Sequence, residues 1–234
     1  MRRDSGDVFL IDVPAARMPW KAEWSPHGVV EVLEPWVADA RRQRLLGVIE
    51  RRIGSVTLLM DAPHDPHNGA AVLRSCDAFG LDTLHVVPQS EPFAAGRRVA
   101  RGSECWVNVV VHDSPAQAIA RLEANGFELV AAHPRGELLP QDLSTITRPC
   151  LVIGNEHDGI SAALLSAARR SVQIPMRGFA ESLNVSVAAA ILLEAATRGR
   201  TGDLDDAARR TLYARGLYRS VNRAADVLSA SRPR

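Results

Sequence analysis

One stretch of the sequence, residues 174–188, combines residue types that could bind and position a ligand. It runs from an apolar segment through Pro175 and Gly178 into an apolar helical pattern, with Ser182 and Asn184 at the expected start of the helix. The first turn of a helix leaves about four backbone N–H groups unpaired and carries a partial positive charge, which suits a carboxylate or a phosphate. A plain capped core helix would show the same residues, and the spacing alone favours neither interpretation.

Two further stretches place polar side chains beside expected turns. Residues 65–74 contain Asn68 and Arg74, and residues 151–161 carry Glu156 shortly after an apolar run. Asn68 could orient a substrate group, or it could form an Asx turn that caps the helix beginning at the next residue. Glu156 could take part in chemistry, or it could be an ordinary loop carboxylate near a helix start.

Several common catalytic patterns are absent from the sequence. No G-x-G-x-x-G follows an expected strand, and there is no G-x-x-x-x-G-K-[ST], H-E-x-x-H or G-x-S-x-G. These absences argue against the usual nucleotide-binding and hydrolase classes. The first expected strand is followed by Asp61-Ala62-Pro63 instead of a Gly-rich turn, which argues against a Rossmann-type methyltransferase.

Short apolar runs alternate with amphipathic segments between residues 54 and 200. Strands are expected at residues 56–60, 84–87, 106–111, 128–132, 150–153 and 172–175, and helices at 69–79, 115–125, 161–169 and 182–198. This alternation predicts a parallel, doubly wound α/β sheet. Ligands bind such sheets at the carboxyl ends of the strands, so we expect a cofactor where three turns converge there: Ala132-His133, Gly154-Asn155-Glu156 and residues 176–184.

The segments around this core divide by composition. Residues 1–30 are expected to form an extended or partly ordered arm, in which Trp20 and Trp24 dock on another part of the protein. The predicted organisation continues with a basic helix at 31–53, an α/β domain at 54–200, and a basic amphipathic tail of one or two helices at 201–234.

Net charge does not identify a nucleic-acid binder, because the whole chain balances at +1. Local Arg clusters carry that argument instead. Arg41 and Arg44 lie in the basic helix, and a Gly-containing loop before a strand holds Arg97, Arg98 and Arg101. We expect these side chains to contact an RNA backbone, with a solvated helix face and a plain surface turn as the alternatives.

The cysteines and the hydropathy pattern exclude further classes. Cys76, Cys105 and Cys150 are widely spaced and form no C-x-x-C pattern, so we expect no zinc or other metal site and no disulfide framework. No apolar run reaches the ~18 residues of a membrane span, and no secretory signal is evident. We therefore expect a cytoplasmic protein without a membrane partner.

Taken together, the three chemical stretches resemble the motif set of the SPOUT RNA 2′-O-methyltransferases, specifically the TrmH (SpoU) branch, over roughly residues 41–200. The resemblance implies a parallel α/β sheet with a deep C-terminal trefoil knot, S-adenosylmethionine as the cofactor, and a homodimer. The catalytic residues that it implies are Asn68, Arg74, Glu156, Ser182 and Asn184. The cofactor-binding residues that it implies are Ala132, His133, Gly154, Asn155, Ile174, Met176, Ser182 and Leu183.

The resemblance also implies a substrate. The members of the branch that this chain resembles most methylate the ribose 2′-hydroxyl of a tRNA D-loop guanosine, guanosine 18. A ribosomal RNA 2′-O-methyltransferase is the alternative within the same class, although such enzymes generally carry a separate N-terminal RNA-binding domain. A catalytically silent RNA-binding assembly factor is a third interpretation, which the intact catalytic set disfavours.

Methyl transfer to a 2′-hydroxyl requires the oxygen to lose its proton as it attacks. Arg74 is a poor base, because the pKa of a guanidinium exceeds about 12. We therefore expect its cation to stabilise the developing alkoxide and orient an RNA phosphate, with that phosphate or a water accepting the proton. The mechanisms proposed for the family also include Arg as the base.

Overall fold

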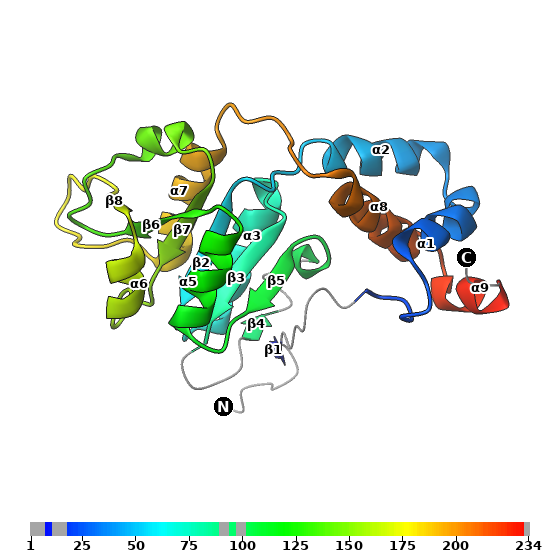
Figure 1. Ribbon diagram of the computed structural model, residues 1–234, viewed down its shortest axis with the longest axis horizontal. Helices are drawn as coiled ribbons and strands as arrows, with labels where there is room; N and C mark the ends of the chain where they lie inside the picture. Colours follow the sequence, from blue (N-terminus) through cyan, green and yellow to red (C-terminus); the bar gives the residue numbers. More distant parts are fainter. Residues whose placement is uncertain (1–7, 11–17, 89–93, 97–101, 232–234) are drawn as a thin grey trace. The chain divides into compact units, whose positions relative to one another are not determined.

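The structure, a computed structural model, describes residues 8–10, 18–88, 94–96 and 102–231 (Figure 1). The chain divides into two compact units, each of which joins segments that are far apart in sequence. Residues 1–16 and 53–200 form the sheet unit, and residues 17–52 and 201–234 form the helical unit.

Six strands form the main sheet of the sheet unit, in the order β5-β3-β2-β7-β6-β8. Their bounds are β2 Thr57–Asp61, β3 Thr83–Val87, β5 Asn108–Val111, β6 Glu128–Ala132, β7 Pro149–Ile153 and β8 Arg170–Val172. Every neighbouring pair is parallel, which confirms the predicted sheet. The central strands β2 and β7 are buried along their whole length, because helices cover both faces.

The covering helices make the fold doubly wound (Figure 1). They are α3 Pro66–Ala78, α5 Pro115–Ala124, α6 Ala162–Ala167 and α7 Val185–Thr197. Helices α3 and α7 pack on each other over one face, and α5 and α6 pack together over the other. Successive residues of a strand point to opposite faces, so Leu58 belongs to the first core and Leu59 to the second.

The last strand and the helix after it differ from the prediction. β8 ends at Val172, which lies opposite Ala132 of β6, so the strand expected at 172–175 is wrong. Pro175 lacks the N–H that a strand ladder requires, and the chain forms a loop up to Asn184. Asn184 is the N-cap of α7, and Ser182 therefore precedes the helix that it was expected to open.

A second, two-stranded sheet joins segments that the sequence pattern treated as arm and loop. β1 (Val8–Leu10) pairs antiparallel with β4 (Ala94–Gly96). Part of the expected N-terminal arm thus belongs to the sheet unit. A 3-10 helix, η2 (Ser103–Cys105), leads into β5, and another, η3 (Pro140–Thr145), packs on α7.

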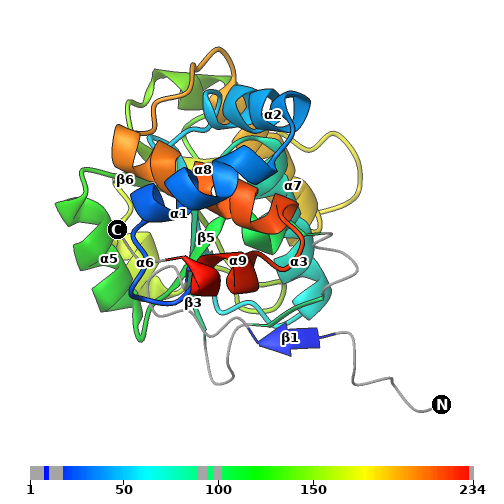
Figure 2. The ribbon, with the colours of Figure 1, turned by 90° about the vertical axis from the view of Figure 1, so that its right-hand side faces the viewer.

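Within the described residues, the helical unit consists of four α-helices and a short 3-10 helix. Figure 2 shows its helices from the side. They are α1 Pro26–Leu33, η1 Glu34–Trp36, α2 Asp39–Ile49, α8 Asp206–Ser220 and α9 Ala224–Ala230. Helix α8 packs against α1 and α2, and α9 packs against α1. The Tyr213 hydroxyl donates to the Glu34 carboxylate at 2.6 Å, a hydrogen bond between residues 179 positions apart.

The helical unit has its own buried side chains. Trp20 and Trp24 are both buried, and the indole N–H of Trp20 donates to the backbone oxygen of Trp24 at 3.0 Å. The Trp20 ring lies 5.9 Å from that of Tyr218 on α8. Gly216 permits close packing on α2, because a Cβ there would lie 2.7 Å from a side-chain carbon of Leu45. The docking expected of the two tryptophans therefore occurs within this unit.

The basic helix predicted at residues 31–53 is interrupted. Helix α1 already begins at Pro26, where the side chain of Ser25 caps it. Pro35 lies in the first turn of η1, and Val37 has extended backbone angles before α2 starts at Asp39. The Pro and the extended residue explain why the apolar period did not continue as a single helix.

Candidate active site

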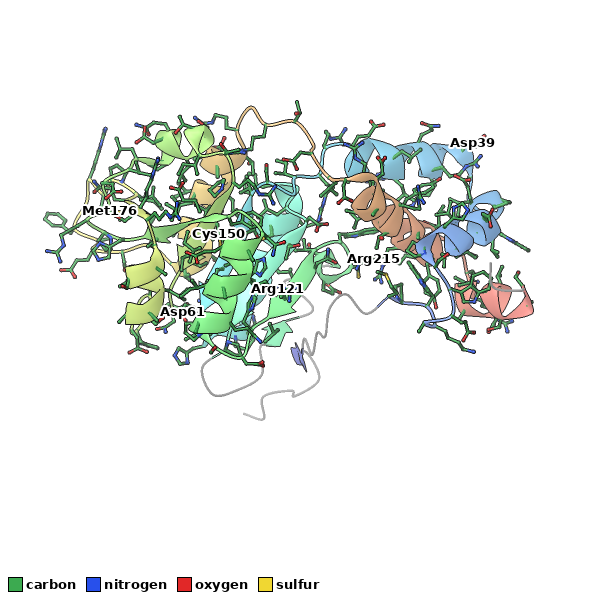
Figure 3. The ribbon with its side chains drawn as sticks, in the orientation of Figure 1. Asp39, Asp61, Arg121, Cys150, Met176 and Arg215 are labelled. Atoms are coloured by element: carbon green, nitrogen blue, oxygen red, sulfur yellow. The ribbon has the colours of Figure 1, made fainter. Side chains whose placement is uncertain are left out.

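A cavity of about 830 Å³ lies at the carboxyl ends of β6, β7 and β8. The turn after β6, the loop after β7 and the loop between β8 and α7 line it, and Figure 3 labels Met176 on the last of these. All eight predicted cofactor residues line this cavity: Ala132, His133, Gly154, Asn155, Ile174, Met176, Ser182 and Leu183. The predicted convergence of the turns is confirmed, while the binding role of each residue stays a prediction.

The loop after β7 is a tight, internally bonded turn. The side-chain oxygen of Asn155 accepts the backbone N–H groups of His157 at 2.8 Å and Asp158 at 2.7 Å. The backbones of Asn155 and Gly159 pair with each other, and Gly159 has a left-handed φ of 70°. Gly154 faces this pair so closely that a Cβ would lie 2.0 Å from the carbonyl carbon of Gly159. Two glycines therefore allow the turn to close on itself.

A buried carboxylate fixes the end of the same loop. Asp61, the last residue of β2 and labelled in Figure 3, accepts the backbone N–H of Ser161 at 2.6 Å. Ile160, next to this bond, lines the cavity. The sequence analysis used Asp61 only to argue against a Rossmann turn. A carboxylate at the end of a buried strand nevertheless indicates a hydrogen-bond donor nearby, because a buried charge needs a partner.

Four polar side chains form a hydrogen-bonded chain beside the cavity. Asn68 of α3 donates through Nδ2 to Oε1 of Glu156, and its Oδ1 accepts Nδ2–H of Asn184 at 3.0 Å. Oδ1 of Asn184 accepts the backbone N–H of Ser186 at 2.8 Å and its hydroxyl at 2.6 Å. Three predicted catalytic residues thus touch one another, and Ser186 is a member that sequence reasoning missed. Its position two residues after an N-cap Asn was the available signal.

The structure distinguishes the two interpretations of these asparagines. Asp65, not Asn68, caps α3, because its Oδ1 accepts the N–H of His67 at 2.8 Å. Pro66 follows at the first helical position, where its missing N–H costs nothing. The Asn68 side chain is therefore not required as a cap and reaches Glu156 and Asn184 instead. Asn184 serves both as the cap of α7 and as a member of the chain.

The other two predicted catalytic residues, Ser182 and Arg74, lie apart from these hydrogen-bonded side chains. Ser182 is exposed and lines the cavity, but it makes no hydrogen bond to the four side chains. Arg74 is exposed on α3 and does not line the cavity, and within the described part of the chain its side chain makes no hydrogen bond or ion pair. Because Arg74 follows Asn68 by six positions, the two leave the helix about 120° apart.

The predicted RNA-contacting arginines are only partly described. Arg41 and Arg44 are both exposed on α2, and Nε–H of Arg41 donates to the hydroxyl of Ser220 at 3.0 Å. Arg97, Arg98 and Arg101 lie outside the described residues, so the prediction for their loop remains untested.

The described residues contain neither a membrane-spanning helix nor a metal cluster. Among them, no helix is long and apolar enough to cross a membrane. They also contain no group of three or more His, Cys, Asp or Glu side chains that could hold a metal ion.

The sequence of this chain is similar to those of known proteins. Residues 55–194 match the SpoU rRNA Methylase family. The tRNA (guanosine(18)-2′-O)-methyltransferase of Escherichia coli is 35% identical over 161 residues, which are 68% of this chain and 70% of that protein. The protein of the same name from Thermus thermophilus is 37% identical over 163 residues, 69% of this chain and 84% of that one.

Solved structures agree with the sequence comparison. The Aquifex aeolicus TrmH/SpoU tRNA modifying enzyme superposes with a TM-score of 0.70 at 29% identity, over 79% of this chain and 98% of that one. The SpoU methyltransferase AviRb from Streptomyces viridochromogenes, solved with its cofactor AdoMet, gives 0.57 at 30% identity, over 64% of this chain and 60% of that one. The matched family segment, residues 55–194, covers more than half of the chain and includes every residue that lines the cavity. The chain therefore belongs to the SpoU methylase family.

Proposed function

We propose that this protein is an S-adenosylmethionine-dependent methyltransferase that modifies the ribose 2′-hydroxyl of guanosine 18 in the D-loop of tRNA. The observation that carries the proposal is the cavity at the carboxyl ends of β6, β7 and β8, with the chain of Asn184, Asn68 and Glu156 beside it. The protein that holds this site is 35% and 37% identical to two proteins named for this reaction. The same substrate suggests a cytoplasmic protein.

The cavity suits S-adenosylmethionine. Its volume of about 830 Å³ lies within the roughly 300–1,000 Å³ typical of small-molecule sites. Apolar side chains of Ile153, Ile174 and Leu183 offer a surface for a purine ring. Carboxylates of Glu156 and Glu181 offer acceptors for ribose hydroxyls and for an ammonium group. We also propose that the loop between β8 and α7 takes part in the trefoil knot typical of the fold.

The side chains of the protein have separate tasks in this proposal. When bound, S-adenosylmethionine supplies an electrophilic methyl group on a positively charged sulfur. Asn68, oriented by Glu156 on one side and Asn184 on the other, presents its second amide N–H to the ribose oxygen. Arg74 supplies a cation that stabilises the developing alkoxide and holds an RNA phosphate, which accepts the proton directly or through a water. Ser182, on the wall of the cavity, lies within the loop that encloses the reacting groups.

The position of Arg74 supports a homodimer. A site that needs this cation is incomplete in one chain, since Arg74 does not line the cavity of its own chain. Helix α7, which begins at the Asn184 cap, exposes the apolar side chains of Val187 and Ile191 one turn apart. An isologous contact through this stripe would cover apolar surface and bring Arg74 of one protomer to the site of its partner.

The comparisons favour tRNA over ribosomal RNA. The relatives named for tRNA guanosine 18 are covered over 70% and 84% of their length. A solved rRNA methyltransferase from Sinorhizobium meliloti is 26% identical, and this chain covers only 59% of it. The length of this chain fits the tRNA enzymes better.

A methyl-transfer assay tests the proposal. The protein is incubated with radiolabelled S-adenosylmethionine and, in parallel, with total tRNA or with ribosomal RNA, and the product is digested to nucleosides. We expect label in 2′-O-methylguanosine from the D-loop of tRNA only. Label in ribosomal RNA alone would support the alternative substrate, and no label in either RNA, despite a thermal shift with the cofactor, would contradict the activity.

A further inference from the structure

The charge of the chain is divided unevenly between its two units. The helical unit contains fourteen Lys and Arg against nine Asp and Glu, a balance of +5, whereas the sheet unit has fourteen against eighteen, a balance of −4. Exposed arginines of the helical unit include Arg41, Arg44, Arg210 and Arg219. Although the net charge of the whole chain is close to zero, the helical unit is basic and therefore suited to bind a polyanion.

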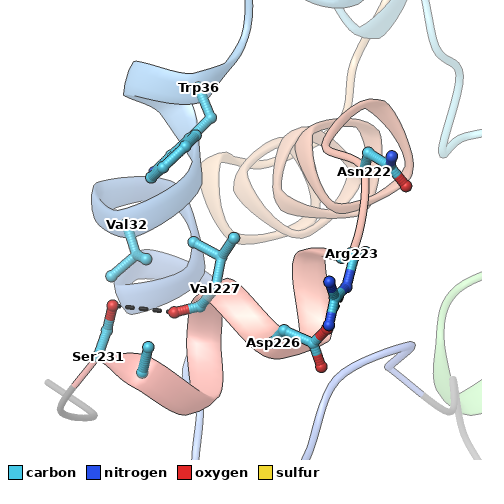
Figure 4. Close-up of a pocket in the computed structure, with 8 residues that line it drawn as sticks. Val32, Trp36, Asn222, Arg223, Asp226, Val227 and Ser231 are labelled. Carbon is cyan, nitrogen blue, oxygen red and sulfur yellow. Dashed lines mark hydrogen bonds and ion pairs between the residues drawn. The ribbon is translucent and has the colours of Figure 1, made fainter.

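The same unit contains a groove with an exposed aromatic wall (Figure 4). Its volume is about 650 Å³, and it lies between the α1–η1 segment and α9. Trp36 lines it with 67% of its surface exposed, whereas Trp20 and Trp24 in the same unit are 7% and 5% exposed. Val32 and Val227 supply apolar surface beside the indole. A large flat ring left exposed in a groove is a stacking surface.

The rim of the groove carries groups that can bind a nucleotide. Arg223 has a left-handed backbone with φ 56°, which is uncommon for a residue other than glycine and costs conformational energy. Its Nε–H donates to Asp226 at 2.6 Å, so the pair stands at the rim with the Nη groups of Arg223 unpartnered among the described residues. The amide of Asn222 also lines the groove.

We infer that this groove binds an unstacked nucleobase of the tRNA substrate, stacked on Trp36, with Arg223 at the adjoining phosphate. The inference rests on the proposed function for the identity of the RNA. The positive charge balance of the helical unit favours a polyanionic backbone, while the indole, the valines and Asn222 in the groove favour a neutral planar group. Asp226 disfavours an acidic peptide side chain and can accept N–H groups from a base edge. A nucleotide strand satisfies both requirements.

Two variants of Trp36 test the groove by tRNA binding. Loss of stacking in Trp36→Ala should weaken binding of tRNA roughly 5- to 150-fold, and Trp36→Phe, which keeps a ring, should lose much less. The KM for tRNA should rise while kcat at saturating tRNA stays near the wild-type value. Val48→Ala is the matched control, because Val48 is exposed on α2 in the same unit but does not line the groove, and its tRNA affinity should be unchanged.

Fluorescence supplies a second readout. Trp36 is far more exposed than Trp20 and Trp24, so a base stacked on it should quench the tryptophan emission when tRNA is added. Trp36→Phe should lose most of this quench while it retains tRNA binding. The thermal shift caused by S-adenosylmethionine should be the same in all variants, which shows that the sheet unit is intact.

The outcomes separate the groove from the proposed function. If the wild-type protein methylates tRNA but Trp36→Ala binds tRNA as tightly as the Val48→Ala control, the inference about the groove is wrong and the proposed function stands. If the wild type methylates no tRNA and binds none, both are wrong. If Trp36→Ala instead turns a wild-type dimer into a monomer in sedimentation, the groove is a contact between copies of this chain, and the nucleobase assignment is overturned.

Discussion

The amide of Asn68 is held on both sides, and this distinguishes it from a helix cap. It donates to Glu156 and accepts from Asn184 at 3.0 Å, so its orientation is fixed before any substrate binds. Asp65 performs the capping that the sequence also allowed for Asn68. Preorganised donors of this kind need no rearrangement when charge develops on a reacting oxygen.

The role of Arg74 can be tested by two substitutions. If the cation stabilises the developing alkoxide, Arg74→Lys should keep part of the activity, and Arg74→Ala should lose about 2.7–4 kcal/mol of transition-state stabilisation, as for a deleted oxyanion donor. Cofactor binding should be nearly unchanged in both variants. Single-turnover rates at saturating tRNA and cofactor provide the measurement.

A pH series separates this role from the alternative in which Arg74 is the base. Lys has a pKa of about 10.4, below that of Arg, so a catalytic base at this position would shift the pH–rate profile of Arg74→Lys to lower pH. Wild-type activity in Arg74→Ala would contradict both roles.

A buried histidine pair makes the stability of the sheet unit depend on pH. Nδ1 of His85 and Nε2 of His112 lie 2.9 Å apart, on β3 and directly after the neighbouring β5. Burial, with the charges of His112 and Arg121, lowers the pKa of His85 from 6.5 to about 3. The unfolded chain therefore binds a proton at His85 more readily than the folded chain does. The contribution of neutral His85 to the free energy of unfolding is complete above pH 6.5 and is lost as the pH falls from there toward 3.

The expected size of this effect is about 2 kcal/mol of unfolding free energy between about pH 7.5 and pH 5. In His85→Gln, which does not titrate, the loss on acidification should be smaller by about that amount. Urea unfolding at the two pH values measures it. Equal pH dependence in His85→Gln and the wild type would show that the pair does not carry the effect.

At the scale of elements, the turn after β7 depends on the absence of a side chain at residue 154. An added methyl group in Gly154→Ala would lie 2.0 Å from the carbonyl carbon of Gly159 and force the turn open. We expect a stability loss of about 1–3 kcal/mol, as in other overpacked sites, and weaker S-adenosylmethionine binding. Isothermal titration with the cofactor measures the second effect.

Gly178 supplies the matched control for this prediction. It lies in the neighbouring loop between β8 and α7, and a Cβ there would meet nothing within 4 Å. Gly178→Ala should therefore bind the cofactor as the wild type does. If both variants bind equally well, the close approach at Gly154 is not what shapes the cavity.

The elements themselves were largely predictable from local patterns. β6 begins and ends at the predicted residues 128 and 132, because a buried parallel strand is marked by an unbroken apolar run between polar turns. The edge strand β8 was misplaced, since its apolar pattern continues past Val172 although Pro175 cannot extend a ladder.

Contacts between distant segments were not predictable in this way. The convergence of three turns followed from the parallel topology, but the bonds from Asn68 to Glu156 and from Asp61 to Ser161 join residues 88 and 100 positions apart. The pairing of α1 with α8 likewise leaves no local signal, so the two ends appeared as a separate arm and tail. Periodicity reports which face of an element is buried, not which partner covers it.

At the scale of the whole molecule, we propose that a second copy of the chain supplies Arg74 to the site. We expect the protein to sediment as a dimer, and a charge on the exposed stripe of α7, in Ile191→Glu, should produce a monomer that binds S-adenosylmethionine but does not methylate tRNA. Analytical ultracentrifugation with parallel activity measurements tests this. A monomeric wild type with full activity would remove the shared site from the proposal.

The discontinuous helical unit affects the order in which the protein can fold during synthesis. Glu34 of the first segment bonds to Tyr213, which the ribosome adds 179 residues later. At about 5–20 residues per second, that interval is roughly 10–35 s. All of the sheet unit has been synthesised before α8 emerges, so it can fold first. Trp20 and helix α1, which pack against α8 in the folded protein, meanwhile stay uncovered by it, and the nascent chain presents this apolar segment to chaperones throughout that time.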